Sequence, residues 1–261
     1  MLLRLAAAVL LFASTAPAQG QTRTVTQLSY AAYAAGFHVL LLDAKADLGR
    51  AAYRVDLRFR TTGVFGFVFP AQFDSFAVGT WSEGLPAPQR YASWGVARGT
   101  DRRTVLDYPA GQPILREHIP EVDDERDPVP PGAERDSVDT LSAMAYLVRR
   151  VAETGACDGR SRLYDGHRVF EIVSRTVARE VLPQEDRSIY AGPALRCDFE
   201  GRQTAGYTRD QDDTERHRLH LSQAWLAPIV PGHPALPVRV MFETRFFGHA
   251  TAYLTGAAPV R

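Results

Sequence analysis

The chain has 261 residues, of which 45% are hydrophobic and 23% are charged, a composition typical of a folded globular protein and not of a disordered one. Its 30 basic and 30 acidic side chains give a formal net charge of zero. This balance provides no basic field that would hold nucleic acid or an anionic membrane, so nucleic acid is excluded as a partner.

The first residues have the pattern of an export signal. Met1 to Arg4 form a short positive start, residues 5–13 (LAAAVLLFA) are apolar, and Ala16-Pro17-Ala18 has the small residues that signal peptidase recognises. The apolar run is short for a membrane span, and a buried N-terminal helix is the alternative. We expect a signal peptide over 1–18, and an exported, periplasmic, soluble chain over 19–261 with no transmembrane segment after cleavage.

Alternation of apolar and polar residues dominates the rest of the chain. In residues 52–60 (AYRVDLRFR) the apolar side chains take one face and the charged ones take the other, which is typical of a strand with one wet face. Similar patterns predict strands near residues 25–35, 37–48, 73–80, 89–97, 103–108, 188–199, 216–221 and 238–242. One wet face favours antiparallel pairing. The prediction is a mainly β fold, a large curved antiparallel sheet that is barrel-like or a half-barrel.

One segment has helical spacing instead. In residues 136–155 (DSVDTLSAMAYLVRRVAETG) an apolar stripe repeats every three or four positions, an N-cap is available at Asp136, Ser137 or Asp139, and Gly155 can end the helix. We expect one long amphipathic helix packed on the sheet. The acidic, proline-rich residues near 119–136 precede it and lack the spacing of a calcium loop, so we interpret them as a solvated connection within a single β-rich domain.

The most unusual stretch is residues 63–73 (GVFGFVFPAQF), in which Phe65, Phe67 and Phe69 alternate. One interpretation is a core strand followed by a proline turn. The other is an aromatic lip on an apolar cavity, because cavities for apolar ligands are lined in this way. The predicted cavity lies beside the helix stripe, and its lining is Phe65, Phe67, Phe69, Phe73, Phe76, Leu141, Met144 and Val148.

The two cysteines, Cys157 and Cys197, flank residues 163–172 (LYDGHRVFEI), which have the pattern of a hairpin. In an exported chain two cysteines most simply form one disulfide. Asp165-Gly166 between alternating residues predicts a two-residue hairpin turn that pairs Tyr164 with His167. The turn therefore has a structural role, and we assign no catalytic role to the histidine after it.

Familiar catalytic and metal-binding motifs are absent from the sequence. It contains no Gly-x-Ser-x-Gly, no Gly-x-Gly-x-x-Gly, no phosphate-binding Gly-Lys-Ser/Thr and no His-Glu-x-x-His. His217 and His220 would point to opposite faces of the predicted strand, which does not suit a metal site. We predict no catalytic residue, no metal and no cofactor, although a site built from distant strands would leave no motif.

Four segments together carry a resemblance: residues 136–150 (DSVDTLSAMAYLVRR), the 163–172 hairpin, residues 197–207 (CDFEGRQTAGY) and residues 236–254 (LPVRVMFETRFFGHATAYL). They resemble the exported bacterial proteins of domain of unknown function 3108. The resemblance covers roughly residues 28–254 and implies a β-rich periplasmic domain in which Asp139 and Asp165-Gly166 recur. It supplies no catalytic residue.

Two function classes remain open. The first is a non-catalytic envelope protein that binds an apolar small molecule, a lipid or an envelope partner. The second is an envelope hydrolase whose site is assembled from dispersed Asp, Glu and His. An apolar pocket favours the first, and a cleft in which carboxylates and histidines converge favours the second.

Overall fold

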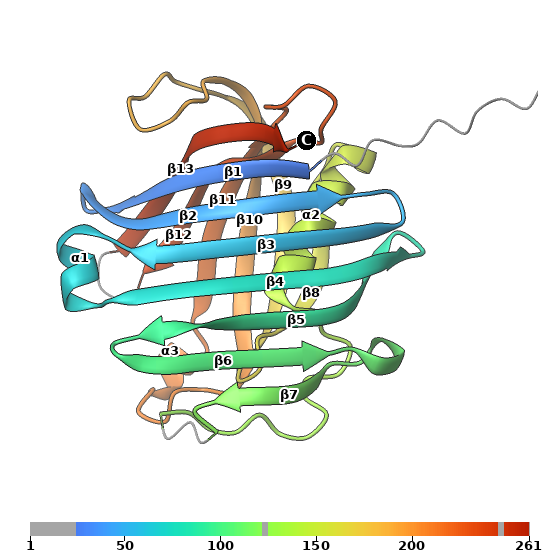
Figure 1. The fold of residues 1–261 in the computed structure, drawn as a ribbon, viewed down its shortest axis with the longest axis vertical. Helices are drawn as coiled ribbons and strands as arrows, with labels where there is room; N and C mark the ends of the chain where they lie inside the picture. The colour runs from blue at the N-terminus through green and yellow to red at the C-terminus, as the bar shows by residue number, and fades with distance from the viewer. Residues whose placement is uncertain (1–24, 122–124, 245–247, 261) are drawn as a thin grey trace, which may run out of the picture.

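The computed structural model describes residues 25–121, 125–244 and 248–260. The predicted signal peptide, residues 1–18, lies outside them. Thirteen strands in the described residues form one antiparallel sheet, with the order β7-β6-β5-β4-β3-β2-β1-β13-β12-β11-β10-β9-β8 (Figure 1). The strands are β1 Val25–Ala34, β2 Phe37–Leu48, β3 Ala52–Thr61, β4 Ala71–Ser82, β5 Leu85–Ala97, β6 Thr100–Asp107, β7 Ile114–Ile119, β8 Gly159–Tyr164, β9 Val169–Leu182, β10 Gly192–Ala205, β11 Leu219–Ala227, β12 Leu236–Thr244 and β13 Gly248–Val260. The helices are α1 Gly63–Val68, the short 3₁₀ turn η1 Pro109–Gly111, α2 Thr140–Thr154 and α3 Asp213–Arg216.

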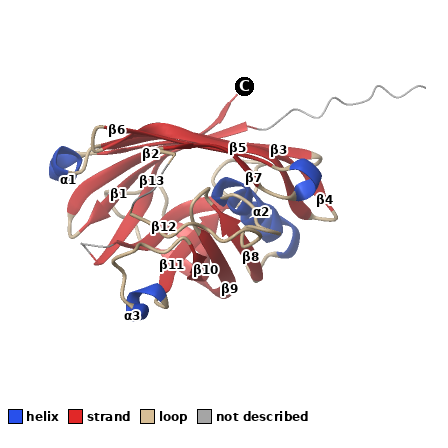
Figure 2. Ribbon diagram, turned by 90° about the horizontal axis from the view of Figure 1, so that it is seen from below, coloured by secondary structure: helices blue, strands red, loops and turns tan. Residues whose placement is uncertain are grey.

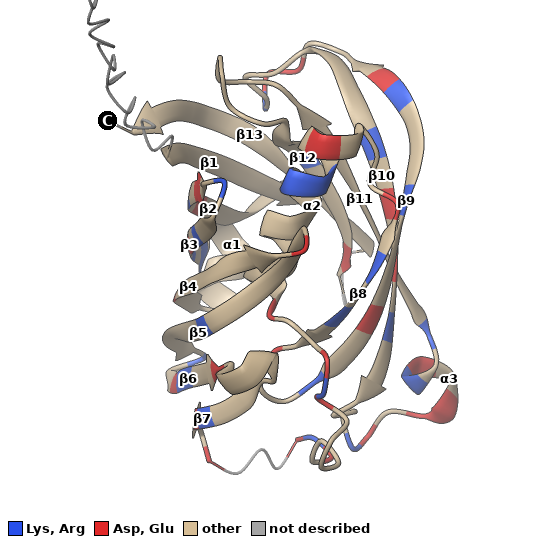
Figure 3. Ribbon diagram, turned by 90° about the vertical axis from the view of Figure 1, so that its right-hand side faces the viewer, with Lys and Arg blue, Asp and Glu red and all other residues tan. Residues whose placement is uncertain are grey.

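The sheet curls into two walls but does not close. Strands β1 to β7 form one wall, β8 to β12 form the other, and α2 lies between them (Figures 2 and 3). The edge strands β7 and β8 stand at opposite ends of the strand order, so a seam separates them. The predicted mainly β fold with a curved antiparallel sheet is confirmed. None of the described helices combines the length and apolar character that crossing a membrane requires.

Alternation decides which face of the sheet meets the helix. Tyr53 and Val55 of β3 and Ala77 of β4 are buried against Leu141 and Ala145 of α2. The charged residues between them in β3 lie on the opposite, solvated face, where Arg54 and Asp56 form an ion pair. The alternation of apolar and polar residues in this strand predicted such a sheet, with one face covered and the other in solvent.

Helix α2 begins and ends where the sequence indicated. The carboxylate of Asp139 accepts a hydrogen bond from the Ser142 N–H, and Gly155 ends the helix in the left-handed region with φ 71°. Val148 and Val151 are buried, whereas Met144 is 44% exposed at the margin of the apolar stripe. The stripe is therefore narrower than the sequence pattern suggested.

The core strand that was one interpretation of residues 63–73 is wrong for their first part, because Gly63–Val68 form the helix α1. Phe65 and Phe69 are four positions apart, and their ring centroids lie 5.2 Å from each other. The connection is closed by Thr61, whose hydroxyl donates to the Phe69 carbonyl at 3.0 Å. A Cβ at Gly66 would lie 2.9 Å from the Thr61 backbone, so the glycine permits this tight turn. The alternating phenylalanines favoured a strand, and nothing in the pattern indicated the close approach at Gly66.

The strand expected over 216–221 also begins later than predicted. Residues up to Arg216 belong to α3, and β11 begins only at Leu219. The carboxylate of Asp212 accepts from the Glu215 N–H at 2.8 Å, which caps this single turn. The cap overrides the alternating pattern that follows it.

The predicted disulfide between Cys157 and Cys197 is present, and both residues are fully buried. It joins the segment after α2 to β10, with the two Cα atoms 5.9 Å apart. The largest core cluster lies around it and includes Leu226, Leu236 and Leu254. The disulfide therefore links the C-terminal end of α2 to β10, within the wall that β8 to β12 form.

Candidate functional site

The seam between β7 and β8 is bridged by the segment 126–138. On the β7 side, the side-chain amide of Gln112 donates to the Asp136 carboxylate at 2.9 Å. On the β8 side, the Val138 N–H donates to the carbonyl of Arg162 at 2.9 Å. The segment that the sequence indicated to be a solvated connection thus lies between the two edges of the sheet, and the cavities described below are lined by it.

The hairpin tip between β8 and β9 differs in detail from the prediction. Leu163 pairs with Phe170 and Tyr164 with Val169, so four residues, 165–168, connect the strands. The Asp165 carboxylate accepts from the N–H of Arg168 at 2.8 Å and of His167 at 3.2 Å, which closes the longer turn. The expected two-residue turn is therefore wrong. The register moves by two positions, and the side chains of the hairpin that are buried in the core are Tyr164 and Val169.

Gly166 allows this hairpin tip to lie against β6 and β7 of the opposite wall. It has φ 100°, and a Cβ there would lie 2.4 Å from Thr104 of β6 and 3.4 Å from Leu115 of β7. A side chain in this position would push the hairpin away from both strands. Asp165-Gly166 therefore narrows the seam, in addition to turning the chain.

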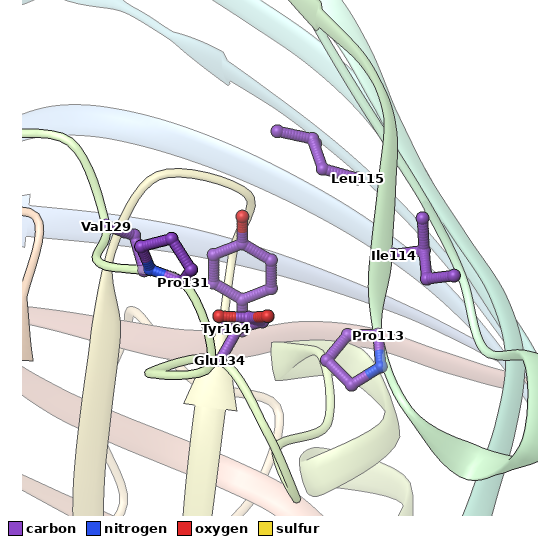
Figure 4. Close-up of a pocket in the computed structure, with 7 residues that line it drawn as sticks. All are labelled: Pro113, Ile114, Leu115, Val129, Pro131, Glu134 and Tyr164. Atoms are coloured by element: carbon purple, nitrogen blue, oxygen red, sulfur yellow. The ribbon is translucent and has the colours of Figure 1, made fainter.

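An apolar cavity of about 280 Å³ lies in the narrowed seam. Figure 4 shows Tyr164 between the 129–134 segment on one side and β7 on the other. The lining residues are Pro113, Ile114, Leu115, Val129, Pro131, Glu134 and Tyr164. Tyr164 is held in place because its hydroxyl donates to the Gly166 carbonyl at 2.9 Å and its ring is buried with Leu106 and Val169. This cavity has a fixed base, and Glu134 is the one charged side chain in its lining.

A second cavity of about 350 Å³ adjoins the first and shares Leu115, Val129 and Tyr164 with it. Its other lining residues are mostly polar: His118, Glu121, Arg126, Asp127, Pro128, Gly166, His167 and Arg209. We call the first cavity, whose lining side chains are apolar apart from Glu134 and the Tyr164 hydroxyl, the apolar end, and the part of the second cavity lined by His118, His167 and Arg126 the polar end.

Two histidines from opposite sides of the seam meet at the polar end. The ring centroids of His118, on β7, and His167, on the hairpin tip, are 5.4 Å apart. Burial lowers the pKa of His167 to about 4, and the positive charges of Arg168 and Arg126 act in the same direction. The buried Nδ1 atom of His167 has no hydrogen-bond partner among the described residues. His167 also lines the second cavity, so this neutral ring can contact a polar group placed there.

The neighbouring carboxylate is already engaged. Burial acts to raise the pKa of Asp165, but Arg168, His167 and the backbone donors outweigh it and hold the pKa below its usual value. An oxygen of Asp165 lies 3.7 Å from Nδ1 of His167, which is too long for a hydrogen bond. A histidine whose pKa is about 4 is a weak base near neutral pH. The group is better suited to binding than to proton transfer.

The eight residues that the sequence indicated as a ligand site are not brought together. Phe65, Phe67 and Phe69 lie in or directly after α1, and Leu141 and Val148 are buried in α2. Phe73 stacks on Phe59 with ring centroids 5.2 Å apart, whereas Phe76 lies under the Arg54 guanidinium on the solvated face. Ligand binding by this set stays a prediction.

The seam cavities could not be predicted from the sequence, because the residues that line them come from three distant segments. Leu115, Val129 and Tyr164 belong to β7, to the proline-rich segment and to β8. The sequence did single out the Asp165-Gly166 tip, which is the one signal that led to this region. Within the described part of the chain, no three His, Cys, Asp or Glu side chains are grouped as metal ligands.

Comparisons with known proteins agree with this architecture. A crystal structure titled as a beta-barrel-like protein of domain of unknown function DUF1849, from Brucella abortus, matches with a TM-score of 0.52. The two chains are 9% identical, and the match covers 91% of this chain and 98% of the other, so the likeness concerns the fold alone. Among curated proteins nothing matches the chain. The family model for "Protein of unknown function (DUF3108)" matches residues 29–255, and the chain therefore belongs to that family.

Proposed function

We propose that this protein is a non-catalytic binding protein of the bacterial cell envelope that holds a small amphipathic molecule in the seam of its half-barrel. The observation that carries the proposal is the pair of adjoining cavities that share Leu115, Val129 and Tyr164. Small-molecule sites are usually apolar clefts with a few convergent polar groups. The apolar cavity takes the body of the ligand, and His118 and His167 face its polar head.

The export part of the proposal has two supports. The N-terminal 18 residues have the composition of a signal peptide, and the buried disulfide suits an oxidising compartment. The proposed location is the periplasm, where the partner would be an apolar small molecule or a lipid of the envelope. The proposed ligand is apolar, as expected from the sequence, but its proposed site is the seam and not the phenylalanines.

Titration with 1-anilinonaphthalene-8-sulfonate, a dye with an apolar body and an anionic head, tests the site. We expect wild-type protein to bind the dye, and Leu115→Glu to bind it roughly tenfold to a hundredfold more weakly, because a charge replaces an apolar contact in the wall that both cavities share. Leu115 is 38% exposed, so this change should leave the fold intact. Circular dichroism and urea unfolding check that it does.

Two control variants show where the dye binds. Val181→Glu changes a side chain that is 77% exposed on β9, and Phe67→Glu changes one that is 88% exposed on α1. Both should bind the dye like wild type. Loss of dye binding in Phe67→Glu but not in Leu115→Glu would place the dye on the surface of α1 and refute the seam site.

A further inference from the structure

Four strongly exposed apolar side chains gather at the end of the sheet where β1 turns into β2. Val64, Phe67 and Val68 of α1 are 74%, 88% and 56% exposed, and Phe37, the first residue of β2, is 68% exposed. We call these four residues the apolar rim. Most folded monomers scatter exposed apolar residues singly, and a contiguous group marks an interaction surface.

The rim is held together by contacts between α1 and β2. The Thr62 N–H donates to the Val39 carbonyl at 3.0 Å, and a Cβ at Gly63 would lie 2.8 Å from the carbonyl oxygen of His38. Figure 1 shows α1 at one end of the strands, while α2 lies toward the other end. The rim therefore projects as a short, fixed tip on the far side from the helix.

Arginines flank the rim, and the two segments that form it contain no acidic residue. In residues 59–73 the only charged side chain is Arg60, and in residues 33–42 there is no acid. Arg98 in the β5–β6 turn donates its N–H to the Pro70 carbonyl at 2.8 Å and holds its guanidinium 5.1 Å from the centre of the Phe69 ring. Arg60 and Arg98 are both exposed. The tip thus combines apolar side chains with local positive charge.

We propose that the apolar rim docks onto the surface of a phospholipid bilayer that contains anionic lipid. Phe67 and its three neighbours enter the interface, and Arg60 and Arg98 meet the anionic headgroups, as in other interfacial anchors. Because the chain has a formal net charge of zero, the attraction comes from this local arrangement. A stable protein partner would need about 1,000 Å² of complementary surface, which a projecting helix of six residues does not offer. This surface is separate from the seam site.

Vesicle sedimentation tests the proposal with the chain from Gln19 onward, which contains every element of the described fold. The probes are vesicles of phosphatidylglycerol with phosphatidylethanolamine, and vesicles of phosphatidylcholine alone. We expect the protein to sediment with the first kind and less with the second. The double variant V64E/F67E should have a partition coefficient roughly tenfold to a hundredfold lower, because an apolar side chain leaves the interface. The variant R60Q/R98Q should lose the preference for phosphatidylglycerol.

Val181→Glu is the matched control, since it places the same charge on an equally exposed apolar position away from α1. It should bind vesicles like wild type, and Leu115→Glu should do so too, which separates this result from the ligand site. Wild type that stays in the supernatant would overturn the proposal, as would equal losses in V64E/F67E and Val181→Glu. Sedimentation velocity tests whether the apolar rim instead binds a second copy of this chain. A wild-type dimer that V64E/F67E converts to monomer, without vesicle binding, would make the rim an interface between copies of this chain and would also overturn it.

Discussion

Replacing both Cys157 and Cys197 by alanine should lower the free energy of unfolding by about 3.9 kcal/mol, because the disulfide closes a 40-residue loop and restricts the unfolded chain. Both residues are fully buried, and Ala fills most of the volume that each leaves. The loss is large for a domain whose whole stability is on the order of 10 kcal/mol. Urea unfolding of the double variant and of wild type measures it.

Two measurements accompany the double variant. Wild type unfolded in urea without reductant should show no free thiol, and wild type unfolded with reductant should lose a similar amount of stability. Two labelled thiols per unreduced chain would show that the bond does not form. A change of less than about 1 kcal/mol would show that the loop is already restricted in the unfolded state.

The second large effect concerns the buried carboxyl of Asp139 at the start of α2. Its side chain accepts from the Ser142 N–H at 2.8 Å and the Ser142 hydroxyl at 2.6 Å, and the Tyr53 hydroxyl donates to Ser142 in turn. Burial raises the pKa of Asp139 to about 6, although the hydrogen bonds from Ser142 act in the opposite direction. An N-cap carboxyl that is fully enclosed therefore holds a proton more tightly in the folded state than in the unfolded chain.

This raised pKa predicts a pH dependence with a definite sign. Between about pH 4 and pH 6 the folded state binds a proton that the unfolded state releases, so the contribution of Asp139 to stability falls as the pH rises. Relative to wild type, Asp139→Asn should gain about 2 kcal/mol between pH 4 and pH 7, since it has no proton to lose.

The comparison of the two proteins isolates this residue, because other groups contribute to both pH profiles alike. Urea unfolding of wild type and Asp139→Asn at a series of pH values gives the difference directly. A difference that stays constant from pH 4 to pH 7, or that moves in the opposite direction, would show that the Asp139 carboxyl titrates near its ordinary value.

Local patterns were sufficient to predict most of the fold. The β3 alternation, the α2 stripe with its cap at Asp139 and its end at Gly155, and the disulfide all correspond to the structure. Each of these depends on residues close in sequence or on a pair with few alternatives. The errors at α1 and at the start of β11 arose where a local cap or a close approach at glycine outweighed an alternating pattern. The hairpin turn was expected to be two residues shorter than it is.

The candidate site was harder to predict because it lies in the gap between the two edge strands, β7 and β8, and local sequence patterns do not reveal which strands are edges. Nothing in residues 113–119 reveals that β7 is an edge strand facing the hairpin tip across a seam. His167 illustrates the limit. The sequence predicted that it directly follows a hairpin turn, and the structure adds His118 from the other edge. That pairing spans 49 positions and follows only from the curvature of thirteen strands.

The most direct test of the ligand-binding proposal is a native mass spectrum of the protein recovered from its own cell envelope. We predict a chain that begins at Gln19, contains one disulfide and carries one bound small molecule. The adduct should be absent from Leu115→Glu and present in Val181→Glu. Wild type found empty, under conditions in which its complex with 1-anilinonaphthalene-8-sulfonate survives in the spectrometer, would contradict the proposed function.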